Sequence, residues 1–378
     1  MGTVALVGLR SGALDAAERL GLSVAAVVES PPGPKTRARL GAVVEADFDG
    51  PPGAWVAAAD ALRPLDPEAV VALTERSVVP AAHLRAALGL DGLSVETARQ
   101  CTDKAAMKRA ARAAGLVCAP YVEADEGLDA DALVDRLGLP LVLKRCVGSG
   151  SRGTHVVRDR AGMPDRLGAG WLAEGFVEGV EMSAELLVAD GEALFFNPTQ
   201  YLVPAWASVV PAPLPEADRA AVRSVAETAA RAFGVTRGMT HLEVFLTPDG
   251  PVFGEMAARP PGGHLMTLIR HAYGVDPWEA VLEVERGERP ALPEAPAQAA
   301  AVWILHPGAG TVREADGVEA AQALPGVEAV ALRVAPGDVV RPRGGTGEEV
   351  GHVVVTGETA AEAAARVRAA REVLRLGV

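Results

Sequence analysis

Lysine is rare in this chain, and two of its lysines lie in sequence that suits a phosphate ligand. Only four of the 36 basic residues are lysines. Lys104 lies in the run Thr-Asp-Lys-Ala-Ala-Met-Lys, and Lys144 ends an apolar run just before a glycine-rich segment. An ammonium group is a compact point charge and a guanidinium is a planar fork, so the two are not interchangeable at such a site. The placement predicts that Lys104 and Lys144 meet a nucleotide triphosphate, with chance retention as the alternative.

The glycine-rich segment after Lys144 has the pattern G-x-G-x-x-G. It consists of Gly148, Ser149, Gly150, Ser151, Arg152 and Gly153. A dinucleotide-binding turn of this pattern opens a helix, but the Thr154-His-Val-Val run that follows is β-branched and apolar, which is typical of a strand. The pattern therefore predicts two strands joined by a glycine hairpin, whose backbone N–H groups could close over phosphates. A plain hairpin without a ligand is the alternative.

Two glutamates occupy matching positions on two predicted strands. Glu243 and Glu255 flank the turn Thr247-Pro-Asp-Gly250, so a hairpin would bring their carboxylates side by side. Like charges placed this way are costly unless a cation shares them. Mg²⁺ binds one or two protein carboxylates together with substrate phosphates. The spacing therefore predicts a magnesium–nucleotide site, and exposed hairpin acids are the alternative.

The order of these motifs resembles the ATP-grasp superfamily. The resemblance covers about 95–290 and rests on five motifs, namely Thr-Asp-Lys104-x-x-Met-Lys, Lys144 with the glycine-rich segment, Glu174-Gly-Phe-Val with Glu181, His241-Leu-Glu243, and Glu255-Met-Ala-Ala-Arg259-Pro-Pro-Gly-Gly. Within the superfamily the chain is most similar to the L-amino-acid (dipeptide) ligases, which are carboxylate–amine ligases. The segment from Leu324 to Val353 resembles the small domain that follows the ATP-grasp domain in those enzymes and in biotin carboxylases.

The resemblance implies a set of ATP contacts. Lys104 and Lys144 would hold the phosphates, under the glycine-rich segment as a lid. The remaining contacts would come from Glu174 to the adenine amino group, from the backbone of Phe176 and Val177 to the adenine ring, and from Glu181 to the ribose hydroxyls. Adenine's amino group is a donor that needs such an acceptor, and a carboxylate can accept from both hydroxyls of a ribose. A solvated strand face is the alternative for these glutamates.

The resemblance also implies ATP and Mg²⁺ as cofactors, with Mn²⁺ as a possible substitute. Glu243 and Glu255 would be the metal ligands. Many members of the superfamily carry an asparagine two residues after the second glutamate, but Ala257 occupies that position here. The number of metal ions therefore stays open.

On the substrate side, the resemblance gives Arg259 the central role. This arginine would bind the substrate carboxylate and the developing acyl phosphate, because a guanidinium matches both anions in a bidentate way. Arg259 and Lys144 would be the catalytic residues. The other substrate contacts would come from Gly262, Gly263 and His264. Glu75 is a further candidate, because it follows the apolar run 70–73 and a strand end there could face the same cleft. The implied reaction forms an amide or peptide bond through an acyl phosphate, from small-molecule carboxylate and amine substrates whose identities the sequence does not show.

Two other functions fit parts of the sequence. One is bicarbonate activation, as in biotin carboxylase or carboxyaminoimidazole ribonucleotide synthetase, and the segment from Glu255 to His264 resembles that of the synthetase. A non-catalytic ATP sensor would bind nucleotide without turnover, but the retention of Lys104, Lys144 and Arg259 argues against it. The aromatic segment 195–211 fits either a substrate-facing loop or core packing, and His241 fits either a substrate contact or a structural role.

The elements that must position these residues follow from hydrophobic periodicity. Apolar runs over 3–8, 24–28 and 70–73 alternate with helical stretches and predict an open parallel sheet. We expect an α/β fold, α+β in parts, with an N-terminal domain over 1–95, an ATP-grasp domain over 96–290 with a mobile lid over about 115–175, and a small C-terminal domain over 291–378. One helix over 94–114 would hold Lys104 near its middle. The turn 8–12 would form one wall of a substrate pocket.

Composition restricts the classes of partner. A net charge of −13 without a basic block argues against a nucleic-acid partner. Three cysteines without metal-type spacing fit a reduced, cytoplasmic compartment. We see neither a signal peptide nor a membrane helix, and the resemblance makes a homodimer a sensible expectation.

Overall fold

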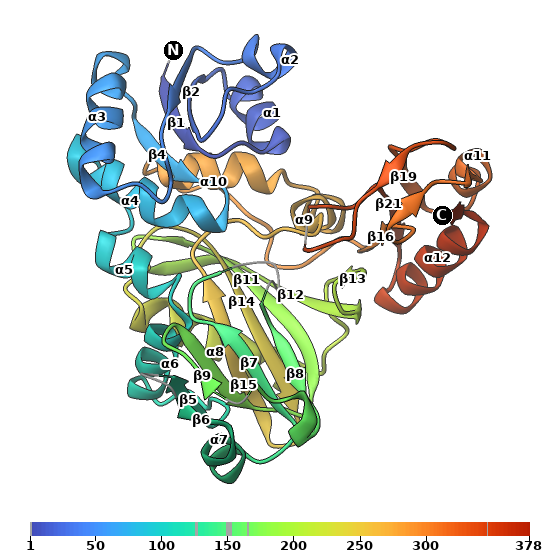
Figure 1. Cartoon of the computed structure of the whole chain (residues 1–378). Helices are drawn as coiled ribbons and strands as arrows, with labels where there is room; N and C mark the ends of the chain where they lie inside the picture. The colour runs from blue at the N-terminus through green and yellow to red at the C-terminus, as the bar shows by residue number, and fades with distance from the viewer. Residues whose placement is uncertain (1, 125–127, 149–152, 165, 346) are drawn as a thin grey trace.

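The computed structural model describes residues 2–124, 128–148, 153–164, 166–345 and 347–378. These residues form two four-stranded sheets, one eight-stranded sheet and three two-stranded ribbons (Figure 1). The N-terminal segment, the central sheets and the C-terminal segment surround the candidate site from three sides. Among the described helices, none is long and apolar enough to cross a membrane.

The N-terminal segment forms a parallel sheet in the strand order β3-β2-β1-β4. Its elements are β1 (Thr3–Val7), α1 (Ser11–Arg19), β2 (Ser23–Val28), α2 (Pro34–Arg37), β3 (Ala42–Glu45), α3 (Pro52–Leu62), η1 (Arg63–Leu65), β4 (Ala69–Ala72), η2 (Glu75–Ser77) and α4 (Val78–Leu88). Helices α3 and α4 pack on one face. Helix α1, together with α10 (Pro277–Glu285) from much later in the chain, covers the other face. The predicted open parallel sheet is confirmed.

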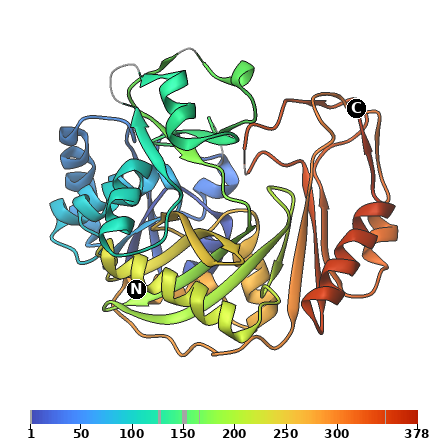
Figure 2. The ribbon, with the colours of Figure 1, turned by 90° about the horizontal axis from the view of Figure 1, so that it is seen from below.

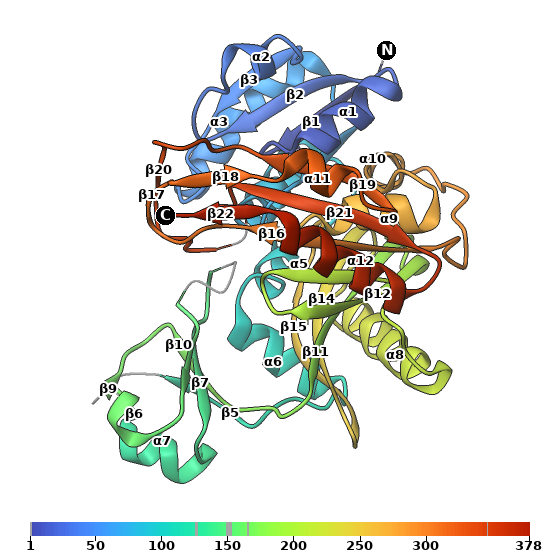
Figure 3. The ribbon, with the colours of Figure 1, turned by 90° about the vertical axis from the view of Figure 1, so that its right-hand side faces the viewer.

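A smaller subdomain carries the glycine-rich segment. Its antiparallel sheet has the order β5-β10-β7-β8, and Figure 3 shows it standing apart from the eight-stranded sheet. Its elements are β5 (Tyr121–Ala124), β6 (Leu128–Asp129), α7 (Ala130–Leu137), β7 (Leu141–Arg145), β8 (His155–Val157), η3 (Arg160–Gly162), β9 (Arg166–Leu167) and β10 (Trp171–Gly175). Strands β7 and β8 pair on either side of the glycine-rich segment, as predicted.

The eight-stranded sheet is antiparallel and has the order β15-β14-β11-β12-β13-β16-β21-β19. Its central part contains β11 (Val180–Ala189), β12 (Glu192–Val203), β13 (Ala207–Val210), α8 (Glu216–Ala232), β14 (Gly238–Thr247), β15 (Gly250–Ala257), α9 (Leu265–Tyr273) and α10. Helix α8 buries its apolar face against one side of this sheet. Helices α9 and α10 lie on the other side, in a core that continues into the N-terminal sheet.

The C-terminal segment extends the same sheet. Its elements are β16 (Ala299–Leu305), β17 (Gly310–Thr311), β18 (Glu314–Asp316), α11 (Val318–Gln322), β19 (Val327–Leu332), β20 (Val339–Val340), β21 (Gly351–Gly357), α12 (Ala360–Val373) and β22 (Arg375–Gly377). Strand β16 pairs with β13, while α12 gives the segment a core of its own. Figure 2 shows this segment on the opposite side of the molecule from the N-terminal helices. The predicted α+β character is confirmed, and the proposed domain limits stay a prediction.

The single helix predicted over 94–114 is wrong. The chain forms α5 (Val95–Gln100) and then α6 (Lys104–Ala113). The Asp103 carboxylate accepts hydrogen bonds from the backbone N–H groups of Ala105 and Ala106 at 2.9 and 3.1 Å. An aspartate that caps a helix in this way satisfies donors that have no partner inside the helix. Lys104 therefore begins a helix instead of lying in the middle of one.

Candidate active site

Two cavities meet at one point of the molecule. The small cavity, of about 360 Å³, is lined mainly by residues of the four-stranded subdomain and of β14 and β15. The large cavity, of about 890 Å³, is bounded by the N-terminal, central and C-terminal segments. The residues that line both are Lys104, Gly148, Glu181, Glu243 and Glu255. A ligand in the small cavity can therefore reach a ligand in the large one at this junction.

Three of the four lysines line the small cavity. Lys104 and Lys108 lie one turn apart on α6, so both project from the same face of the helix. Lys144 comes from β7. The sequence argument singled out Lys104 and Lys144 but gave Lys108 no role, although its spacing of four residues from Lys104 was a usable signal. The lysines of this chain are therefore concentrated at one cavity.

Glu174 on β10 holds two of these lysines. Its carboxylate lies 2.9 Å from Lys108 Nζ and 2.8 Å from Lys144 Nζ, and it is buried. Burial opposes ionisation of Glu174, but the two ammonium groups prevail and lower its pKa. Burial likewise works against the charge on Lys144, yet the Glu174 and Glu255 carboxylates raise its pKa. The predicted contact of Glu174 with adenine stays a prediction, and its observed partners are the lysines.

Glu243 and Glu255 face each other at the junction. They are directly paired residues of β14 and β15, as the hairpin predicted. The register shifts between Glu243 and Val244, which leaves Gly254 as an extra residue on β15. A Cβ atom on Gly254 would lie 2.7 Å from the Glu243 carbonyl oxygen, so only glycine fits this bulge. Gly254 thus allows Glu255 to stand opposite Glu243.

The charges at the junction are only partly balanced. Lys104 Nζ lies 3.3 Å from the Glu255 carboxylate and donates a hydrogen bond of 2.9 Å to the Gly148 carbonyl oxygen. Burial and then the negative charge of Glu255 raise the pKa of Glu243 to about 7. A carboxylate whose charge is opposed in this way gains from a cation placed between the pair.

The junction suits a magnesium ion shared with a phosphate better than a metal ion held by protein ligands alone. Among the described residues, no group of three or more His, Cys, Asp or Glu side chains is arranged to hold a metal ion. Mg²⁺ does not need such a cage, because it takes one or two carboxylates and completes its shell with phosphates and water. Glu243 and Glu255 would hold the ion. Their oxygen donors and the raised pKa of Glu243 match that requirement.

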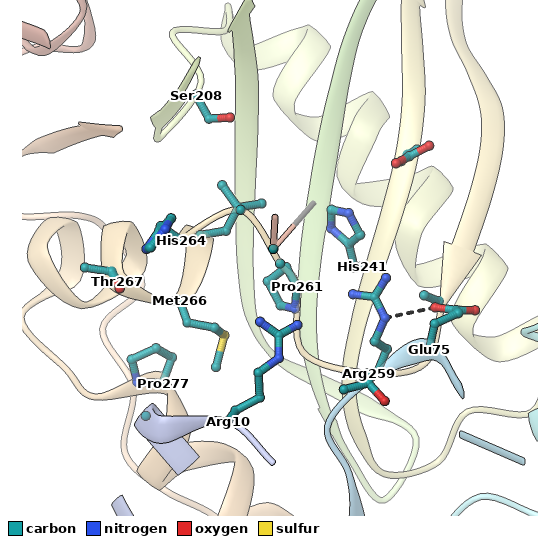
Figure 4. Close-up of a pocket in the computed structure, with 18 of the residues that line it drawn as sticks. Arg10, Glu75, Ser208, His241, Arg259, Pro261, His264, Met266, Thr267 and Pro277 are labelled. Atoms are coloured by element: carbon teal, nitrogen blue, oxygen red, sulfur yellow. Dashed lines mark hydrogen bonds and ion pairs between the residues drawn. The ribbon is translucent and has the colours of Figure 1, made fainter. Parts of the chain in front are cut away.

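Arg259 lies in the large cavity, in the loop that follows β15. Its Nε donates a 2.9 Å hydrogen bond to the Glu75 carboxylate, and its Nη1 donates one of 2.9 Å to the Pro260 carbonyl oxygen (Figure 4). Glu75 follows β4 of the N-terminal sheet, so two distant segments fix one guanidinium. Glu75 therefore lies in the same cavity as Arg259, and its contact with a substrate stays a prediction.

The predicted residues after Arg259 also line the large cavity. Gly262, Gly263 and His264 turn the chain into α9, and His264 is its N-cap residue with φ of 63°. His264 Nε2 lies 3.3 Å from Glu349 of the C-terminal segment, and its ring centroid lies 4.0 Å from that of His352. The hydrogen bond from His264 lowers the pKa of Glu349 to about 2. Glu349 is a cavity residue that the sequence analysis missed.

His241 belongs to a buried polar network. Its Nδ1 lies 2.9 Å from the carboxylate of Glu185, which also accepts hydrogen bonds from the side chains of Ser183, Asn197 and Thr199. The ring still borders the large cavity. The structural role considered for His241 therefore has direct support.

The aromatic side chains of segment 195–211 lie in two kinds of surroundings. Phe195 and Phe196 are buried in the two cores on either side of the sheet. Tyr201 and Trp206 line the large cavity.

The other predicted ATP contacts lie around the small cavity. Glu181, Phe176 and Val177 line it, together with Gly148 from the start of the glycine-rich segment. Gly153 ends that segment with φ of 73°, in the left-handed region that glycine adopts readily. Ser149, Gly150, Ser151 and Arg152 lie outside the described residues.

Comparisons with known proteins agree with this architecture. Residues 109–272 match the ATP-grasp domain, and residues 302–378 match the L-amino acid ligase C-terminal domain 2. The L-arginine-specific L-amino acid ligase of Bacillus subtilis is 29% identical over 291 residues, which cover 72% of this chain and 70% of that protein.

Solved structures share the fold over nearly the full chain. The L-amino acid ligase of Bacillus licheniformis superposes with a TM-score of 0.83 at 21% identity, covering 100% of this chain and 98% of that one. The N5-carboxyaminoimidazole ribonucleotide synthetase of Thermotoga maritima gives 0.79 at 19% identity, covering 100% and 99%. The two domain matches show that the chain carries an ATP-grasp domain followed by an L-amino acid ligase C-terminal domain, and the solved structures share this fold.

Proposed function

We propose that the protein joins the carboxylate of an amino acid, or of a similar acid, to the amine of a second substrate, at the expense of ATP. The observation that carries this proposal is the junction of the two cavities at Lys104, Glu243 and Glu255. A nucleotide in the small cavity would direct its terminal phosphate to the point where the large cavity can deliver a carboxylate.

The small cavity would bind the nucleotide. Lys104 and Lys144 would contact its phosphates, and Glu181 would accept hydrogen bonds from the ribose. Lys108 and Glu174 position Lys144, because all three lie in one ion-paired group. Glu243 and Glu255 would hold Mg²⁺, which neutralises phosphate charge when bound.

Arg259 would position the acid in the large cavity. A carboxylate oxygen attacks the γ-phosphorus, the bond from this phosphorus to the β-phosphate oxygen breaks, and ADP leaves. The amine nitrogen then attacks the acyl carbon and loses a proton, and phosphate departs. Such phosphoryl transfer depends on positioning and on charge stabilisation more than on covalent help from the protein. The Glu75 contact fixes the Arg259 guanidinium for both anions.

The proposal is tested by measuring phosphate release from Mg·ATP against the twenty standard amino acids, singly and in pairs, with and without bicarbonate. Release that requires an amino acid supports the ligase and names its first substrate. Phosphate release with bicarbonate alone would support a bicarbonate-activating carboxylase in place of the ligase. Nucleotide binding without release under any condition would favour the sensor. The homodimer and the cytoplasmic location expected from the sequence stay predictions.

A further inference from the structure

The arginines that line the large cavity differ in whether the protein gives them a carboxylate partner. There are five of them among the described residues, namely Arg10, Arg19, Arg76, Arg259 and Arg270. Four of the five lie within 4.0 Å of a carboxylate. Arg19 and Arg270 approach Asp276, Arg76 approaches Glu29 and Asp49, and Arg259 approaches Glu75. Within the described part of the chain, the Arg10 guanidinium makes no hydrogen bond and no ion pair.

The backbone fixes Arg10 at the wall of the cavity. Arg10 is the N-cap residue of α1, and its carbonyl oxygen accepts hydrogen bonds from the N–H groups of Ala13 and Leu14 at 3.1 and 3.2 Å. A Cβ atom on Gly12 would lie 2.3 Å from Trp278 Nε1, so this glycine lets α1 pack closely against α10. The first turn of the N-terminal sheet therefore forms the predicted pocket wall. The Arg10 side chain extends into the cavity toward Pro261 (Figure 4), and Arg259 lines the same cavity.

The surroundings of Arg10 favour an anionic ligand. Burial and then the charge of Arg259 lower its pKa, and the Glu349 carboxylate acts in the opposite direction without reaching ion-pair distance. A half-buried guanidinium beside a second one is stabilised when an anion joins them. The other four arginines already have carboxylate partners from the protein, so a ligand carboxylate gains most at Arg10.

The two substrates of the proposed reaction differ in their need for a cation. The carboxylate that is activated loses its charge when the acyl phosphate forms, and its partner Arg259 lies two residues after the end of β15, the strand that carries Glu255. An amine substrate that carries its own carboxylate keeps that charge through the whole reaction. We infer that Arg10 binds the carboxylate of the amine substrate, an inference that rests on the proposed function. The amine substrate is then an amino acid and not a simple amine. Arg10 is thus a determinant of acceptor specificity.

The test separates activation of the acid from use of the acceptor. Hydroxylamine attacks an acyl phosphate to give a hydroxamate and phosphate, and it carries no carboxylate. The probes are the amino-acid pair that gives the fastest phosphate release, the primary amide of its acceptor member, and hydroxylamine in place of the acceptor. The variants are Arg10→Gln, Arg10→Lys and the control Arg39→Gln. Arg39 bonds to Asp15 and Glu18 of the same helix α1 but lies outside the cavity lining.

We expect Arg10→Gln to lower kcat/KM for the amino-acid acceptor about ten- to hundredfold, mainly through KM, because a hydrogen bond to a charged group is lost. The same variant should keep wild-type hydroxamate formation and wild-type rates with the amide acceptor. Arg10→Lys should recover part of the loss, and Arg39→Gln should match the wild type.

Two results for Arg10→Gln would overturn the inference while the ligase function stands. One is an unchanged KM for the amino-acid acceptor. The other is an equal loss of hydroxamate formation, which would place Arg10 on the activated acid. Failure of the proposed function gives a different result, because the wild type would then form no hydroxamate with any of the twenty amino acids.

Discussion

The small and the large cavity carry their charges in opposite ways. In the small cavity, Lys108 and Lys144 share Glu174, and Lys104 reaches Glu255 at the junction. In the large cavity, Arg10 has no protein partner among the described residues, although four neighbouring arginines do. Buried charges require partners, and the protein itself supplies them for the lysines of the small cavity. The large cavity leaves the charge of Arg10 for a ligand to balance, and there we expect specificity to be set.

The largest effect should follow from a change at the junction, where the two cavities depend on each other. Glu255→Gln removes a metal ligand and the partner of Lys104. We expect it to lower kcat by about 10³-fold or more, since such electrostatic groups carry much of the catalysis. The measurement is phosphate release at saturating Mg·ATP. Asp249→Asn, in the exposed turn of the same hairpin, should behave as the wild type. A rate close to wild type for Glu255→Gln would remove this residue from the metal site.

The second effect concerns the shape of a charge in the small cavity. Lys144→Arg keeps the positive charge, but a guanidinium is larger and planar and cannot reproduce the position of an ammonium beside Glu174. We expect KM for ATP to rise about tenfold, corresponding to about 1.4 kcal/mol. Lys35→Arg, at an exposed position, is the control. Normal ATP binding by Lys144→Arg would mean that lysine placement in this chain carries no functional information.

A smaller effect should come from the residue that orients Arg259 in the large cavity. Glu75→Gln weakens the hydrogen bond from Nε but leaves the bond to the Pro260 carbonyl oxygen. We expect KM for the activated acid to rise about three- to tenfold, with KM for ATP unchanged, because a charge-assisted hydrogen bond becomes a neutral one. Glu45→Gln, at the exposed end of β3 on the opposite edge of the same sheet, is the control. A change in KM for ATP alone would contradict the division between the cavities.

The smallest effect is a pH dependence of stability where the C-terminal segment meets the large cavity. Burial, then the charges of His264 and Arg333, lower the pKa of His352 to about 4. The folded protein therefore binds a proton at His352 less readily than the unfolded chain does. This contribution to stability is complete above about pH 6.5 and is lost as the pH falls toward 4, by about 1–2 kcal/mol. Urea unfolding at pH 7 and pH 5 measures it, and His352→Gln should flatten the difference. If the His352→Gln variant showed the same difference in unfolding free energy between pH 7 and pH 5, His352 would be excluded as the source.

The sequence predicted the parts of the site that depend on local pattern. The pairing of Glu243 with Glu255 follows from a short turn between two strands, and the strands around the glycine-rich segment follow from β-branched residues. The prediction of where Lys104 lies in its helix could have been improved, because Asp103 before an apolar periodic run is a helix-start signal. The reach of Glu75 into the cavity of Arg259 followed from its place at a strand end.

The sequence did not predict contacts that depend on how distant segments pack. Glu349 reaches His264 across 85 positions of the chain, and no local pattern marks it. The turn that carries Arg10 was expected to form a pocket wall. Which of the many arginines would lack a protein partner depends on the packing of α1 against α10, which residue spacing does not reveal. Gly254 is one more case, because its bulge exists only in the paired hairpin.

The central claim is that the large cavity delivers a carboxylate to the phosphate held at the junction. The most direct test uses an amino acid labelled with ¹⁸O in its carboxylate and follows the released phosphate by ³¹P NMR. The attacking oxygen stays with phosphorus when the amine displaces phosphate, so each phosphate should carry one ¹⁸O from the acid. Phosphate released without the label, at a rate that still depends on the amino acid, would contradict the account.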